Sequence, residues 1–93
     1  MAQLPPGQAI PTDPKWKEGA VRYWNRGPEF EFEVMKVKIT RAGTWDPTVE
    51  QAGQLLGGIV YQVNEYFDDE SIGEQDYKAA EKDMSIVNKW IKH

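Results

Sequence analysis

The chain has 93 residues, a formal net charge of −4, 40% hydrophobic and 12% aromatic residues, and no cysteine. This size and composition are typical of one folded domain with a modest core. The lack of cysteine excludes disulfides and cysteine-ligated metals, and the acidic charge argues against direct nucleic-acid binding. Because no segment has the pattern of a secretory signal or a membrane span, we expect a cytoplasmic protein without membrane contact.

Residues 1–14 hold four of the six prolines and no long apolar pattern. Such a composition predicts an extended arm with polyproline-like stretches. The arm is either a loosely attached tail or a segment that packs Leu4 and Ile10 onto this or a neighbouring molecule. We favour the tail, followed by a single domain over residues 15–93.

The segment 15–26 is compatible with a helix or a strand, because helix punctuation flanks it while residues 20–24 are rich in strand formers. Residues 29–41 alternate between apolar and charged side chains, which predicts a strand. That strand needs a partner, so we predict a two-stranded antiparallel β-hairpin over about residues 19–41. The apolar phase changes near Val34, which indicates a β-bulge there or burial on opposite faces in the two halves.

The charged residues of segment 29–41 separate by sign along the chain. The first half is acidic and the second half is basic: Glu29, Glu31 and Glu33, then Lys36, Lys38 and Arg41. The simple interpretation is a solvated sheet surface. Acid would oppose base if the strand paired antiparallel with its own copy, so self-association is the alternative.

Residues 46–67 carry the strongest helical pattern, with an Asp-Pro start and apolar residues recurring at steps of three and four. We interpret the glycines within this segment as a smooth strip for close packing, rather than as a kink. A Ser-x-x-Glu capping box then predicts a second helix. The two helices, about 47–67 and 72–91, would form an antiparallel hairpin on one face of the sheet. The predicted fold class is therefore α+β.

No catalytic, cofactor or metal site emerges from the motifs. The acidic segment 68–77 resembles an EF-hand loop, but its fifth and twelfth positions are Ile72 and Ala79, which offer no side-chain oxygen. The single histidine is His93, at the chain end, and no nucleophile–base pair can be assembled. We therefore predict a non-enzymatic protein without a cofactor.

Two groups of side chains remain as candidate binding surfaces. The first has the aromatic and basic composition of an interface hot spot, unless its rings fill the core: Trp16, Arg22, Tyr23, Trp24 and Trp45. The second is acidic and would suit a basic partner, unless it is simply a solvated tip: Glu65, Asp68, Asp69, Glu70, Glu74 and Asp76.

The leading functional hypothesis is a protein–protein interaction module, either an accessory subunit of a larger assembly or a small homo-oligomer. The alternative is an acidic inhibitor or regulator that binds a basic site on an enzyme or a nucleic-acid-binding protein. A small enzyme is the third hypothesis, because a pair of buried carboxyl groups leaves little trace in a sequence. We expect a protein partner or self-association.

Overall fold

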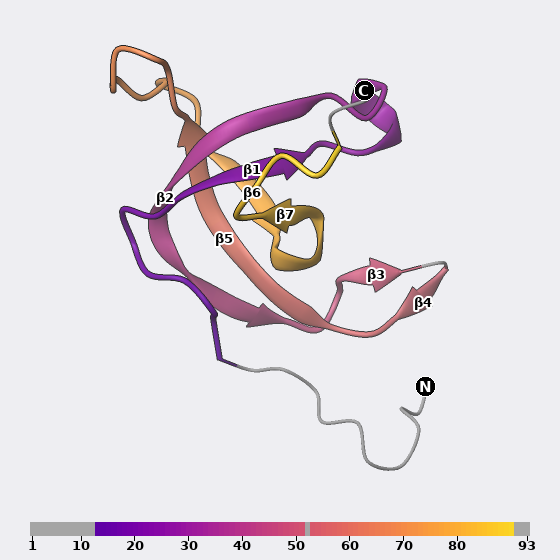
Figure 1. Cartoon of the computed structure of the whole chain (residues 1–93). Helices are drawn as coiled ribbons and strands as arrows, with labels where there is room; N and C mark the ends of the chain where they lie inside the picture. The colour runs from indigo at the N-terminus through magenta and orange to yellow at the C-terminus, as the bar shows by residue number, and fades with distance from the viewer. Residues whose placement is uncertain (1–12, 52, 91–93) are drawn as a thin grey trace.

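The computed structural model describes residues 13–51 and 53–90, and these form a mostly antiparallel β structure (Figure 1). A five-stranded sheet has the order β6-β5-β2-β1-β7, and a separate two-stranded ribbon pairs β3 with β4. The strands are β1 (Val21–Asn25), β2 (Val34–Asp46), β3 (Glu50–Gln51), β4 (Gln54–Leu55), β5 (Gly58–Glu65), β6 (Tyr77–Ala80) and β7 (Met84–Ser85). Two 3-10 turns, η1 (Pro28–Phe30) and η2 (Glu81–Asp83), complete the described elements, and none of these is a helix that could cross a membrane.

The longest strand, β2, is the spine of the sheet. It pairs with β1 along its first half and with β5 along most of its length. The register with β5 shifts between Ile39 and Arg41 and again between Arg41 and Thr44. Such bulges bend a strand and increase its twist, so the sheet curls around its own inner face (Figure 1).

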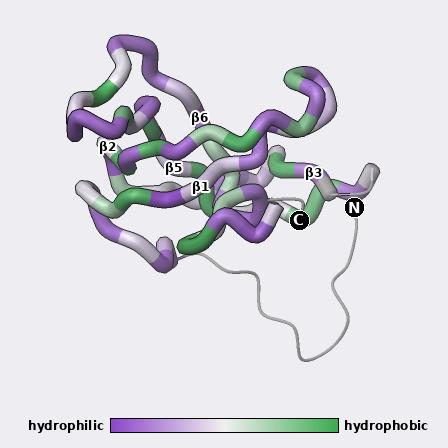
Figure 2. The backbone as a smooth tube through the Cα atoms, turned by 45° about the horizontal axis from the view of Figure 1, so that its top comes forward, coloured by the Kyte–Doolittle hydropathy of each residue, from purple (hydrophilic) through white to green (hydrophobic). Residues whose placement is uncertain are grey.

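The core fills the inner face of this curled sheet. Side chains point to alternate faces of a strand, and Figure 2 shows hydrophobic and hydrophilic residues in turn along the strands. The buried apolar residues come from five strands: Trp24, Met35, Val37, Ile39, Ile59, Tyr61, Val63, Ala79 and Met84. Burying a large apolar side chain contributes about 1.5–3 kcal/mol, so this face supplies most of the stability.

The prediction of a helical hairpin, and with it the α+β class, is wrong. Residues 47–67 form β3, β4 and β5, and residues 72–90 form β6, η2 and β7. Within β5, Ile59, Tyr61 and Val63 recur at steps of two, and all three are buried. Their β-branched and aromatic side chains suit a pleated sheet, and this local preference outweighs the helical spacing. The glycines before β5 also weaken any helix by about 1 kcal/mol each.

The Asp-Pro pair that suggested a helix start forms a turn. The Asp46 carboxylate accepts hydrogen bonds from the Thr48 backbone N–H at 2.8 Å and from its hydroxyl at 2.6 Å. These bonds lower the pKa of Asp46. Close packing does occur at Gly57, which has a φ of 70°. A Cβ there would lie 2.3 Å from the Trp45 ring, so a side chain rather than a second backbone fills the strip.

The antiparallel pairing of the predicted β-hairpin is present, with Val21 opposite Lys38 and Asn25 opposite Val34. The strand nevertheless begins at Val34, because residues 28–33 form η1 and the turn that follows it. The bulges lie after Ile39, not near Val34. The predicted arm falls mainly on residues 1–12, which lie outside the described residues.

Candidate protein-interaction site

Two clusters of tryptophan, arginine, tyrosine and glutamate pack against the core. The first, which we call the latch cluster, consists of Trp16, Arg22, Tyr61 and Glu81, with Lys15 at its edge. The second, which we call the loop cluster, consists of Trp24, Arg26, Phe30, Glu33 and Tyr77. Both arginines come from β1 or the residue after it, and each guanidinium lies over a tryptophan ring.

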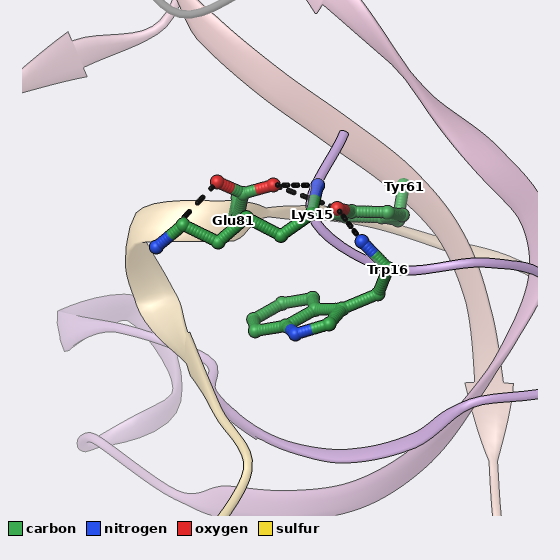
Figure 3. A network of polar contacts seen from close by, with 4 residues as sticks. All are labelled: Lys15, Trp16, Tyr61 and Glu81. Carbon is green, nitrogen blue, oxygen red and sulfur yellow. Dashed lines mark hydrogen bonds and ion pairs between the residues drawn. The ribbon is translucent and has the colours of Figure 1, made fainter. Parts of the chain in front are cut away.

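The latch cluster joins the segment before β1 to β5 and η2 (Figure 3). The buried Tyr61 hydroxyl donates to Glu81 Oε2 at 2.6 Å and accepts the Trp16 backbone N–H at 3.1 Å. The Lys15 backbone N–H donates to the same Glu81 oxygen at 3.1 Å. The Trp16 and Tyr61 rings lie 5.6 Å apart, and Arg22 lies 4.9 Å from the Trp16 ring centroid. Tyr61, Glu81 and the backbone N–H groups of Lys15 and Trp16 are thus joined in one network, while the buried Nε of Arg22 has no hydrogen-bond partner.

Burial, together with the hydrogen bond to Glu81, raises the pKa of Tyr61 to about 12. A hydroxyl with this pKa keeps its proton at neutral pH and remains a hydrogen-bond donor. The opposite arrangement, a lowered pKa, is the one that would activate a hydroxyl as a base or nucleophile. Tyr61 therefore joins Glu81 to the Trp16 backbone as a protonated donor.

The loop cluster is organised around the guanidinium of Arg26, whose side chain is only 12% exposed. Its Cζ atom lies 3.7 Å from the Phe30 ring centroid, 5.1 Å from that of Tyr77 and 5.7 Å from that of Trp24. Its Nη1 also donates to a Glu33 carboxylate oxygen at 3.3 Å. Cation–π contacts of this kind contribute about 0.5–2 kcal/mol each, so Arg26 joins the loop firmly to the core.

Residues 26–33, which we call the interaction loop, are also held by their own backbone. The Arg26 N–H donates to the Glu33 carbonyl at 2.9 Å, and the Phe32 N–H donates to the Gly27 carbonyl at 2.8 Å. The Gly27 N–H donates to the Asn25 side chain at 2.9 Å. The loop is therefore a defined shape whose ends are tied together.

Phe32 is the residue of this loop that the fold itself does not explain. Its side chain is 63% exposed, and its backbone φ is 58°. The preceding Glu31 also has a positive φ, of 55°. Left-handed backbone costs a non-glycine residue about 1–2 kcal/mol, and an exposed ring recovers little of that cost by burial. Such a strained, solvent-facing aromatic residue marks a candidate contact site.

The end of the sheet that carries the interaction loop is strongly acidic. Glu29, Glu31 and Glu33 belong to the loop itself. The connection between β5 and β6, residues 66–76, is also acidic; it follows Glu65, which pairs with Val37, and Figure 1 shows it apart from the interaction loop. A partner that docks on the interaction loop therefore meets negative charge as well as exposed aromatic rings.

All six residues of the acidic candidate surface lie in or beside that second connection. Glu65 is half-buried at the end of β5, and the other five are exposed. The Asp69 carboxylate accepts the Ser71 N–H at 3.0 Å and the Ser71 hydroxyl at 2.5 Å, which lowers the pKa of Asp69. Asp76 accepts a hydrogen bond from the buried Asn64. Two of the six carboxylates thus also shape the connection, and Ser71 closes a turn rather than capping a helix.

The structure does not gather the aromatic candidates into one surface. Trp24 is buried in the core, while Trp16 and Trp45 pack partly buried against it. Tyr23 alternates with Trp24 and so faces the other side of the sheet. The sequence also places Arg26 beside the aromatic residues, but sequence reasoning missed Phe30 and Phe32, because it assigned the Glu-Phe alternation to a strand. The signal that could have found them is the Gly27-Pro28 pair directly before that alternation, which favours a turn.

Neither metal chemistry nor likeness to a known protein assigns a function. Within residues 13–51 and 53–90, no three His, Cys, Asp or Glu side chains lie close enough together to hold a metal ion. Comparison of the chain with protein-family models, with curated proteins and with solved structures finds no match. Function therefore has to be inferred from the geometry of the interaction loop.

Proposed function

We propose that this chain is a non-enzymatic protein–protein interaction module that contacts its partner through the interaction loop. The observation that carries the proposal is Phe32, an exposed ring held in left-handed backbone on a firmly tied loop. Binding hot spots are rich in aromatic residues that insert into pockets. A loop fixed before binding loses less conformational entropy on association, so the ties around Arg26 favour affinity.

The loop also indicates the chemistry of the partner site. Phe30 is half-exposed beside Phe32, and Glu29 and Glu31 are exposed next to them. A complementary site would offer an apolar pocket for the rings and basic side chains around it. Charge at the rim would act mainly on the rate of association, and the buried ring would determine how long the complex lasts.

A second candidate function is an acidic regulator that binds a basic site through the β5–β6 connection. The observation in its favour is the concentration of exposed carboxylates at Asp68, Asp69, Glu70, Glu74 and Asp76. Because charge contacts are screened by salt and apolar contacts are not, the two candidates predict different salt dependence. They also predict that different residues are needed.

Matched baits separate the two candidates. Full-length protein would be immobilised as wild type, Phe32→Asn, Phe67→Ser and Asp68→Lys/Glu74→Lys, and exposed to source-cell lysate. Phe67 is the control, since it is a half-exposed ring in the other connection. Bound protein would be washed at about 0.15 M and then about 1 M salt.

A partner that resists the high-salt wash, stays on the Phe67→Ser bait and is lost from the Phe32→Asn bait supports the interaction loop. A partner that washes off in high salt and is lost from the Asp68→Lys/Glu74→Lys bait supports the acidic regulator instead. Equal recovery on wild type and Phe32→Asn contradicts our proposal.

A further inference from the structure

The outer face of the sheet carries a group of cations that the proposed loop contact does not involve. Lys36, Lys38 and Arg41 come from β2, and Lys78 comes from β6. Arg41 lies opposite Gln62, and Gln62 lies opposite Lys78, so these residues form one row across three strands. We call the four cations the basic face. The chain as a whole is acidic, which makes this local positive charge distinctive.

Two cations of the basic face converge on one ring, and none of the four forms an ion pair within the described residues. Lys36 Nζ lies 5.4 Å and Lys38 Nζ 5.7 Å from the centroid of the same ring, that of Tyr66. The ion pairs of the described residues join Lys15 to Glu81 and Arg26 to Glu33, and neither involves the basic face. Two ammonium groups drawn to one ring repel each other, and an anion placed beside them would relieve that repulsion.

A groove continues the basic face toward the bulged part of β2. It has a volume of about 230 Å³, and its lining includes Arg41, Thr44, Gln62, Lys78 and the carboxylate of Asp46. Asp46 already binds Thr48, and Asp76 at the other margin binds Asn64. Asp46 also interacts electrostatically with Lys78, so Lys36, Lys38 and Arg41 are the cations that remain available to an incoming carboxylate.

We infer that the basic face receives the interaction loop of a second copy of this chain, an inference that rests on the proposed function of the loop. Three glutamates of the loop would meet the available cations of the face, and Tyr66 would offer an aromatic surface to Phe32. Loop and face adjoin on the same molecule, because β2 leads directly from the loop into Lys36 and Lys38. Two copies can therefore exchange loops reciprocally in a two-fold dimer, the commonest oligomer symmetry.

A nucleic acid fits the basic face less well. The acidic loop precedes Lys36 in the chain, and the acidic β5–β6 connection follows Glu65, which pairs with Val37, so both would repel a long polyphosphate. A short segment with a few carboxylates and aromatic rings would avoid that repulsion, because its negative charges would contact only the cations of the basic face. The interaction loop is a segment of this kind.

Sedimentation velocity of the full chain tests the inference through a charge exchange. Lys36→Glu/Lys38→Glu makes both surfaces acidic, and Glu29→Lys/Glu31→Lys makes both basic, so each variant alone should be monomeric. Mixed in equal amounts, they should restore a species of twice 10.7 kDa. A control with the same charge change away from the contact, Lys17→Glu/Lys82→Glu, should dimerise like the wild type. The wild-type dimer should weaken at least about tenfold between low and high salt, because its rim contacts are charged.

A wild type that stays monomeric at every concentration overturns the inference, as does a dimer that survives Lys36→Glu/Lys38→Glu. A monomer that binds a labelled single-stranded DNA oligomer through the same two lysines would also overturn it, because the basic face would then bind a polyanion rather than a second copy. Failure of the proposed function itself would look different. In that case Phe32→Asn would leave both dimerisation and the capture of other proteins unchanged.

Discussion

The latch cluster and the loop cluster share four residue types, yet they differ in exposure. In each, an arginine lies over a tryptophan, a tyrosine packs nearby and a glutamate accepts a hydrogen bond. The latch cluster turns its polar groups inward and joins the chain before β1 to η2. The loop cluster supports a solvent-facing loop with Phe32 at its surface. Composition alone therefore does not distinguish the two clusters, whereas exposure combined with backbone strain does.

The largest expected effect is in the latch cluster, at Tyr61. Tyr61→Phe removes the hydroxyl that joins Glu81 to Trp16, and leaves a half-buried carboxylate with one partner fewer. Loss of such a charged hydrogen bond lowers the free energy of unfolding by about 2–3 kcal/mol, measured by urea denaturation. The matched control is Tyr77→Phe in the loop cluster, whose hydroxyl makes a single exposed bond to Gln75. If both variants lose the same free energy of unfolding, the hydrogen bonds of the latch cluster have no special role in stability.

The next largest effect is expected at Arg26. Arg26→Leu keeps much of the apolar stem but removes the guanidinium from Phe30, Tyr77 and Glu33. We expect the free energy of unfolding to fall by about 2 kcal/mol and the loop amides to exchange hydrogen faster. Arg22→Leu should cost less, because Arg22 stacks on one ring only and donates to the neighbouring Val21 carbonyl. An equal cost at both positions would mean that the loop is not specifically tied by Arg26.

Alkaline pH should weaken the latch cluster through the ionisation of Tyr61. Burial and the hydrogen bond to Glu81 raise the pKa of Tyr61 from its ordinary value of 10.0 to about 12 in the folded protein. Because the folded state holds this proton more tightly, its stabilising contribution is complete below pH 10 and is lost as the pH rises towards 12. The stability difference between wild type and Tyr61→Phe should therefore shrink over that interval. A difference that stays constant would show that Tyr61 does not titrate as the latch requires.

Part of this fold was predictable from residue patterns, and part depended on tertiary context. The alternation of Met35, Val37 and Ile39 correctly predicts a strand paired with residues 21–25. The helical spacing of apolar residues between Val49 and Tyr66 is misleading. Residues 58–65 also fit a period of two, and that period places the larger side chains in the core. Weighing the two periods against each other over residues 58–65, with the glycines before them, would have favoured the strand.

The candidate site was predictable in charge but not in shape. The acidic residues from Asp68 to Asp76 do gather in one connection, as their closeness in sequence requires. The Glu-Phe alternation before Val34 has the pattern of a strand, but local backbone hydrogen bonds close it into a loop and the contact of Arg26 with Tyr77 ties that loop to the core. Exposure and a positive φ at Phe32 are properties of the folded backbone, so no residue pattern could have shown them.

The most direct test of the account is the free energy of unfolding of Phe32→Asn, measured by urea denaturation beside the wild type. Asparagine tolerates left-handed backbone far better than phenylalanine, and the ring it replaces is mostly in solvent. We predict that the variant is as stable as the wild type or up to about 1 kcal/mol more stable, while it loses the partner. A variant that is less stable by more than about 1 kcal/mol would show that the ring serves the fold, and would contradict its assignment to recognition.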